Sequence, residues 1–323
     1  MKKLICVMLT AILALSLFAG CGATADDGIY KIAIVQQLDH ASLNEIRTAI
    51  EAELDRIAAE KSLQIEYKHF NGQNDTTVLG QIGAQVVSDG YDAIIPLATL
   101  AAQYSVTAAE GKNIPIIYAA VSDPVEAGLT GFANVTGVSD ALNTPFILDM
   151  MLAVNPEIQT VGLLYSNSEP NSVTPIKEAK AYLDSKNIAY IEKTGNTADE
   201  VITAVSALVG RCDAVFTPTD NAIMNVAPTV AETLNNAGIP HYTGADSFVQ
   251  AGSFTTCGVN YTELGTYTAA MAMDILQGGA VPEFHVMDGG IITVNTDTAA
   301  ALSLDYSAFS TMANTVVEVK TAG

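Results

Sequence analysis

The string Tyr91-Asp92-Ala93-Ile94-Ile95 returns 121 positions later as Cys212-Asp213-Ala214-Val215-Phe216. Each string ends in an apolar run, which indicates a buried strand of a parallel sheet. Four such pairs in the same order indicate that the chain holds two halves built on one plan. The other three pairs are Asn113-Ile114-Pro115 with Gly238-Ile239-Pro240, Ala127-Gly128-Leu129 with Ala251-Gly252-Ser253, and Thr136-Gly137-Val138 with Cys257-Gly258-Val259.

Short β-branched runs alternate with longer helical patterns from Lys31 onward, which is typical of βαβ units. We therefore predict an α/β fold of two doubly wound parallel-sheet lobes, each with about five parallel strands. Ligands of such sheets bind at the carboxyl ends of the strands, so two facing lobes would form a ligand cleft. The expected strands are 31–36, 63–69, 93–97, 114–119 and 135–138 in the first lobe, and 160–165, 189–193, 214–217, 239–242 and 255–259 in the second.

Two segments each end a set of strands and are expected to carry the chain from one lobe to the other. They are Gly137-Val138-Ser139-Asp140 and Gly258-Val259-Asn260-Tyr261. Crossings of this kind are natural hinges. The predicted N-terminal lobe is 31–139 plus about 261–292, and the predicted C-terminal lobe is 140–260 plus about 293–323.

The N-terminus has the pattern of an export signal, because Met1-Lys2-Lys3 precedes an apolar run that ends at small residues. Leu17-Phe18-Ala19-Gly20-Cys21 resembles a bacterial lipobox, which implies cleavage before Cys21 and lipidation of its sulfur. We expect residues 1–20 to be a lipoprotein signal peptide and residues 21–30 a tether. The protein would then be extracytoplasmic and lipid-anchored to the bacterial membrane. An ordinary signal peptide with a chance cysteine is the alternative.

Composition argues against several classes of function. The formal net charge of −21 would repel nucleic acid. The four histidines are scattered without the helical spacing of a zinc site, so no metal is expected. No nucleophile elbow or phosphate-binding glycine motif occurs, so we expect no cofactor and no enzyme activity. Cys212 and Cys257 are expected to be free buried thiols. Another strand is expected to lie between the two strands that carry them, which puts the sulfur atoms too far apart for a disulfide.

Polar residues that follow the predicted strands are the candidate ligand contacts. In the first lobe Ser42 has the capping-box spacing to Glu45, so a helix is expected to begin near Leu43. Thr99 lies where a strand turns into a helix, and its hydroxyl could hold an anion. Thr99 corresponds through the 121-residue offset to Asp220 in the second lobe. The candidates from this reading are Gln36, His40, Ser42, Thr99, Ser122 and Asp123 in the first lobe, and Asn171, Ser172, Asp220, Asn221 and Asp246 in the second.

A hydroxyl from one lobe and a carboxylate from the other would suit the two charges of an amino acid. The ligand's carboxylate would meet Thr99, Ser42 or nearby helix amides, and its ammonium Asp220 or Asp246. For Ser42, Asp220 and Asp246 the alternative is plain helix capping. Aromatic candidates for contacts with a ligand ring are Phe70, Tyr118, Tyr165 and Phe248.

Several strings along the chain together indicate a family. They include His40-Ala41-Ser42-Leu43, Asn71-Gly72-Gln73-Asn74-Asp75, Ala98-Thr99, Tyr118-Ala119-Ala120-Val121-Ser122-Asp123-Pro124, Glu169-Pro170-Asn171-Ser172 and Pro218-Thr219-Asp220-Asn221. With these strings the sequence resembles, over nearly its whole length, the ABC-transporter substrate-binding family that includes tryptophan- and tyrosine-binding lipoproteins. The resemblance implies a type I periplasmic-binding-protein fold that closes around its ligand. Asn71, Ala101 and Asn143 complete the candidate contacts. Ala41 and Leu100 stand where the family often has proline.

The function implied by the resemblance is that of a solute receptor of an ABC importer. Its expected partners are a small ligand, in the first place an aromatic amino acid, and an ABC permease, with membrane contact through the lipid anchor only. We expect a monomer. Two alternatives are a ligand-sensing input to a signalling partner and a receptor for a sugar or nucleoside. The sequence has no tryptophan, a residue on which sugars commonly stack, and this argues against a sugar as the ligand.

Overall fold

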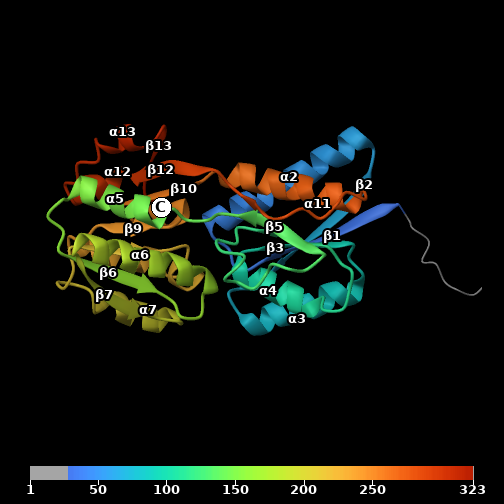
Figure 1. The fold of residues 1–323 in the computed structure, drawn as a ribbon, viewed down its shortest axis with the longest axis horizontal. Coiled ribbons are helices and arrows are strands. Elements are labelled where there is room, and N and C mark those ends of the chain that lie inside the picture. The colour runs from blue at the N-terminus through green and yellow to red at the C-terminus, as the bar shows by residue number, and fades with distance from the viewer. Residues whose placement is uncertain (1–27, 323) are drawn as a thin grey trace, which may run out of the picture.

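The computed structural model describes residues 28–322, which form two lobes that lie side by side (Figure 1). Each lobe has a central sheet with helices on its faces. The predicted signal peptide and Cys21 lie outside the described residues. Among residues 28–322 no helix has the length and apolar character that a membrane crossing requires.

The N-terminal sheet has six strands in the order β11-β5-β4-β3-β1-β2, and every neighbouring pair is parallel. Its strands are β1 (Ile29–Gln36), β2 (Gln64–Asn71), β3 (Ala93–Leu97), β4 (Ile116–Ala119), β5 (Val135–Ser139) and β11 (His285–Val286). Its helices are α2 (Ala41–Lys61), α3 (Thr76–Asp89), α4 (Thr99–Ala108) and α11 (Tyr261–Leu276).

Burial on both faces of this sheet follows from the alternation of side chains along each strand. In β1, Ile32 and Ile34 pack into a cluster with the apolar face of α2, whereas Ala33 and Val35 pack with α3 and α4. Helices α2 and α11 lie against each other on one face (Figure 1). A methyl group on Gly265 would come within 2.5 Å of the Ile46 carbonyl oxygen, so this close helix contact requires glycine.

The C-terminal sheet has seven strands in the order β13-β12-β10-β9-β8-β6-β7. Its strands are β6 (Thr160–Tyr165), β7 (Ala189–Thr194), β8 (Ala214–Thr217), β9 (His241–Thr243), β10 (Thr255–Val259), β12 (Gly289–Asn295) and β13 (Thr315–Val319). Its helical segments are α5 (Thr144–Val154), η1 (Pro170–Ser172), α6 (Val173–Lys186), α7 (Ala198–Ser206), α8 (Asn221–Met224), α9 (Ala227–Asn236), α10 (Asp246–Gln250), α12 (Thr296–Ala301) and α13 (Phe309–Met312).

The prediction of about five strands per lobe, all parallel, is wrong for this sheet, because β12 runs antiparallel to β10 and β13 is parallel to β12. The reason lies in the chain path. After β10 the chain crosses into the other lobe as α11 and β11, and it returns from the side where the parallel strands end. It must therefore enter β12 in the opposite direction. β11 adds a sixth strand to the N-terminal sheet, and the chain re-enters the C-terminal sheet at Gly289.

The ten predicted strands all occur, with ends that differ from the prediction by at most a few residues. Cys212 and Cys257 are free and buried, as predicted. β9 separates β8, which begins two residues after Cys212, from β10, which contains Cys257. This strand order explains why the two thiols are not bridged.

Candidate functional site

A cavity lies between the lobes at the carboxyl ends of their strands. The cavity and its mouth, open solvent included, hold about 400 Å³ of empty space. Both lobes contribute to its wall, and within the described chain no lysine or arginine lines it. The lining residues are His40, Ser42, Leu43, Ala98, Thr99, Ala120, Ser122, Asp140, Asn171, Thr219, Asp220, Asn221, Met224, Ala245, Ser247, Phe248 and Tyr261.

The turns after β3 and β4 bring strained backbone to the cavity. Ala98 has a φ of 75° and Ala120 a φ of 55°, in the left-handed region that L-residues seldom adopt. Such conformations cluster at binding sites, where the surrounding structure enforces them. Ala98 directly precedes α4, so the first residue of this helix, Thr99, faces the cavity. The Thr99 hydroxyl oxygen is buried and has no hydrogen-bond partner among residues 28–322.

The start of α2 differs from the prediction. The helix begins at Ala41, and the N-cap is His40, whose Nδ1 accepts from the Leu43 amide at 3.5 Å. The capping role predicted for Ser42 is therefore wrong. Ser42 instead donates from its hydroxyl to Asp246 in the other lobe at 2.7 Å. Burial lowers the pKa of His40 to about 4, so its imidazole is neutral at pH 7.

Asp220 is fully buried and caps α8 in the C-terminal lobe. Its carboxylate accepts from the Ser166 amide at 2.6 Å, the Ser172 hydroxyl at 2.7 Å and the Ile223 amide at 3.0 Å. These three donors come from three different segments of one lobe. Asp220 therefore joins the turns that form this wall of the cavity, and most of its capacity to accept hydrogen bonds is already used.

Glu169 lies behind this wall and is also buried. It accepts from Gln37 of the N-terminal lobe at 2.9 Å and from Asn221 at 3.0 Å. Burial, and then repulsion from Asp220, raises the pKa of Glu169 well above its usual value. Asn171 donates to the Thr219 carbonyl oxygen, whereas its own side-chain oxygen is buried without a partner in the described structure.

Asp140 faces the cavity directly after β5, where the chain crosses between lobes. Its Oδ1 accepts from the Ser122 hydroxyl at 2.9 Å. Ser122 also shares a 2.9 Å hydrogen bond with Thr219 of the other lobe. Burial raises the pKa of Asp140 to about 6. Tyr261, at the start of α11, lines the same end of the cavity, and burial raises the pKa of its phenol.

Within residues 28–322, side-chain hydrogen bonds join the two lobes at several places. Ser42–Asp246, Gln37–Glu169 and Ser122–Thr219 surround the cavity, and Thr174 donates to Asp123 at 2.6 Å farther out. Because each bond has one partner in each lobe, they can form only when the lobes are close together. The structure is therefore a closed arrangement of the two lobes.

Of the fourteen candidate contacts, seven line the cavity: His40, Ser42, Thr99, Ser122, Asn171, Asp220 and Asn221. Ser172 and Asp246 lie behind it and hold other side chains, and Asp123 lies outside it in the inter-lobe bond to Thr174. Asn143 caps α5 beside a second cavity near the crossing. Ala101 is buried in the core of the N-terminal lobe.

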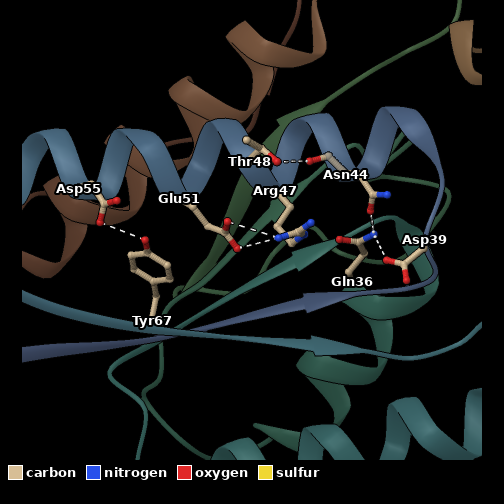
Figure 2. A network of polar contacts seen from close by, with 8 residues as sticks. All are labelled: Gln36, Asp39, Asn44, Arg47, Thr48, Glu51, Asp55 and Tyr67. Atoms are coloured by element: carbon tan, nitrogen blue, oxygen red, sulfur yellow. Dashed lines mark hydrogen bonds and ion pairs between the residues drawn. The ribbon is translucent and has the colours of Figure 1, made fainter.

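Two further candidates, Gln36 and Asn71, stabilise turns rather than the cavity wall. Gln36 donates to Asn44 at 2.7 Å and to Asp39 at 3.1 Å, which fixes the turn between β1 and α2 (Figure 2). Asn71 accepts from the Gln73 amide at 2.7 Å. Among the four aromatic candidates, Phe248 lines the cavity, whereas Phe70, Tyr118 and Tyr165 do not.

Several lining residues were missed from the sequence. Asp140 and Tyr261 belong to the two segments that were predicted to cross between the lobes. Because these segments lie between the lobes, their position could have identified both residues as part of the cavity wall. Ser247 follows the predicted candidate Asp246, and its buried hydroxyl has no partner in the described structure. Met224 and Leu43 add an apolar wall near Phe248, which periodicity alone would assign to the core.

Comparison with known proteins identifies the family. The model for ABC transporter substrate binding proteins matches residues 31–316. The chain belongs to this family. The substrate-binding protein is also 31% identical over 322 residues to a tyrosine-binding protein of Clostridioides difficile, covering 94% of this chain and 93% of the relative.

Two solved structures of the family bear on its conformation. A domain in complex with L-Trp from Streptococcus pneumoniae has a TM-score of 0.83 at 28% identity, covering 89% of this chain and 99% of that one. The ligand-free, open structure of a substrate-binding protein with adhesive properties from Clostridium difficile has a TM-score of 0.68 at 31% identity, covering 91% and 100%. The substrate-binding protein thus superposes better on the ligand-bound structure, in agreement with its closed lobes.

Proposed function

We propose that this protein is the extracytoplasmic receptor of an ABC importer, anchored through a lipid on Cys21, and that its ligand is an aromatic amino acid. The observation that carries the proposal is the chemistry of the cavity wall. A hydroxyl at a helix N-terminus, buried carboxylates and an apolar wall line one cavity between the lobes. These three features match the carboxylate, the ammonium and the side chain of such a ligand.

The end of the cavity at Thr99 suits the ligand's carboxylate. The unpartnered Thr99 hydroxyl can donate there, and the N-terminus of α4 adds the positive end of the helix dipole. Leu43, Met224 and Phe248 form the apolar wall for the ring. Aromatic rings that pack edge to face against Phe248 would gain contact beyond simple burial.

The relatives support the choice of ligand class. One of them is named a tyrosine-binding protein, and another was solved with L-Trp. Ala41 and Leu100, where proline is frequent in the family, both adjoin the cavity wall. We therefore propose the class of aromatic amino acids as ligands and do not carry over the preference of either relative.

A thermal-shift screen of the purified protein with amino acids, sugars and nucleosides tests the proposal. A ligand at about 100 times its Kd adds roughly 2.7 kcal/mol to the free energy of unfolding, which gives a clear rise in Tm. We expect L-tyrosine, L-tryptophan or L-phenylalanine to raise Tm most. A rise with a sugar or nucleoside, and none with any aromatic amino acid, would refute the ligand class.

The lipid anchor is tested separately, because its support is the lipobox pattern alone. In cells expressing the wild-type chain, labelled palmitate should be incorporated and the protein should sediment with membranes. The C21A variant should take up no label and leave the membrane fraction. Equal labelling of wild type and variant would show that Cys21 is not the lipidated residue.

A further inference from the structure

We propose that the Asp140 carboxylate binds the ligand's ammonium group at the crossing between the lobes. The protein would then select ligands that have a cationic nitrogen. The inference rests on the proposed function and deepens it. The sequence suggested Asp220 or Asp246 for this role. The hydrogen bonds around the three carboxylates favour Asp140 instead.

The three carboxylates differ in what they already hold. Asp220 has three donors from its own lobe, and Asp246 is bonded to Ser42 and does not line the cavity. Asp140 lines the cavity and receives one hydrogen bond from another residue, that of Ser122. Its second oxygen has no donor from any other residue that the structure describes. An ammonium group has three N–H donors, one of which could donate to this second oxygen.

The surroundings of Asp140 also call for a cation. A buried carboxylate is stable as an anion only when a positive charge or several donors compensate for lost solvation. No lysine or arginine of the described chain lines the cavity, and His40 is neutral at pH 7. Tyr261, which lines the same end, brings no positive charge, and burial and the charge of Asp140 raise the pKa of its phenol. A ligand that brings an ammonium group would supply the missing charge.

The hydrogen bonds of Ser122 connect this charge to closure of the lobes. A serine hydroxyl has one proton, and Ser122 donates it to Asp140. Thr219 must therefore be the donor in the 2.9 Å bond between the two hydroxyls. An ionised Asp140 thus fixes the direction of two successive hydrogen bonds, in which Thr219 of the C-terminal lobe donates to Ser122 and Ser122 donates to Asp140. An ammonium group that keeps Asp140 ionised would favour this inter-lobe contact.

Three probes separate the charges of the ligand: L-tyrosine, tyramine, which lacks the carboxylate, and 3-(4-hydroxyphenyl)propionate, which lacks the ammonium. Equilibrium dialysis measures each Kd for wild type and for D140N. The wild-type protein should bind L-tyrosine at least about 30-fold more tightly than the propionate. D140N should lose about 30-fold or more for L-tyrosine and tyramine, with little change for the propionate. The exposed D89N at the end of α3 is the matched control for loss of one charge.

The outcomes distinguish this inference from the proposed function. Wild type that binds L-tyrosine and the propionate equally overturns the inference without any variant. So does a D140N protein with wild-type Tm that binds L-tyrosine normally, or one that loses all three probes by the same factor. Wild type that binds none of the three probes, and neither L-tryptophan nor L-phenylalanine, overturns the proposed function, and this inference with it.

Discussion

Thr99 and Asp220 occupy corresponding places in the two halves of the chain, 121 positions apart, and both line the same cavity. Their states are opposite. The Thr99 hydroxyl is buried without a partner, whereas the Asp220 carboxylate holds three donors. A buried polar group without a partner lowers stability, so the unpartnered Thr99 hydroxyl indicates a use that the fully bonded Asp220 carboxylate does not have. The repeated plan thus places an unpartnered hydroxyl at the cavity in one half and a bonded carboxylate in the other.

The largest effect is expected at Asp220. Asp220→Ala would leave two amides and a hydroxyl buried without acceptors, and should lower the free energy of unfolding by about 2–4 kcal/mol. Urea denaturation without ligand measures this change. D220N, which keeps one oxygen acceptor, should lose less. If D220A unfolded at the wild-type urea concentration but no longer bound ligand, Asp220 would be a ligand contact and the contrast with Thr99 would fail.

The next largest effect is the pH dependence of stability, which depends on the buried carboxyl groups of Glu169 and Asp140. Burial raises the pKa of Glu169 and that of Asp140, the latter to about 6. The folded protein therefore holds these protons more tightly than the unfolded chain. The stabilisation is complete below the unfolded pKa values, near 4, and is lost as pH rises through the folded values.

Between pH 7 and pH 9, above the range in which the buried His40 gains its proton, we expect the free energy of unfolding without ligand to fall by about 1–2 kcal/mol. Chemical denaturation at several pH values measures the slope. In E169Q the slope above pH 6 should be flatter, because the variant has no carboxyl group to titrate there. Identical slopes in wild type and E169Q would show that Glu169 does not titrate in this range.

A smaller effect, on binding rather than stability, is expected at Thr99. Thr99→Val removes the hydroxyl and keeps the shape, so Tm without ligand should be unchanged or slightly higher. Affinity for an aromatic amino acid should fall by about 5- to 30-fold, or about 1–2 kcal/mol, as for loss of one hydrogen bond to a charged group. T107V, at an exposed position on the same helix, is the matched control. A fall in Tm with unchanged affinity would reverse the assignment of the two roles.

The smallest effect is expected at Ser247, whose unpartnered hydroxyl belongs to the C-terminal lobe. Ser247→Ala should weaken binding by about 3-fold or less, because a neutral hydrogen bond contributes about 0.5–1.5 kcal/mol at most. Parallel titrations of S247A and T99V would rank the two hydroxyls. A larger loss in S247A would mean that the C-terminal lobe, rather than α4, provides the main hydroxyl contact.

The sequence predicted the lobes well because a parallel strand buried on both faces is an uninterrupted apolar run. The repeated strings located β3 and β8 without error. The direction of β12 could not be predicted in the same way, because its residues would suit either direction. That direction depends on where the chain returns from the other lobe, which is a property of the tertiary structure.

The site was predicted less completely than the fold. Position after a strand identified Thr99, Ser122 and Asp220, since strand ends of both lobes meet at the cavity. It could not show which polar atoms were already bonded. Ser42 fitted a capping box, but the contact with Asp246 comes from a segment 204 residues away. Long-range partners of this kind decide the role of each side chain, and local spacing does not contain them.

The most direct test is calorimetric titration of wild type and T99V side by side with L-tyrosine and L-tryptophan. The account predicts saturable binding of at least one of them, with one site per chain. It also predicts at least about 5-fold weaker binding in T99V at unchanged ligand-free Tm. No saturable binding to wild type, or equal Kd values in the two proteins, would contradict it.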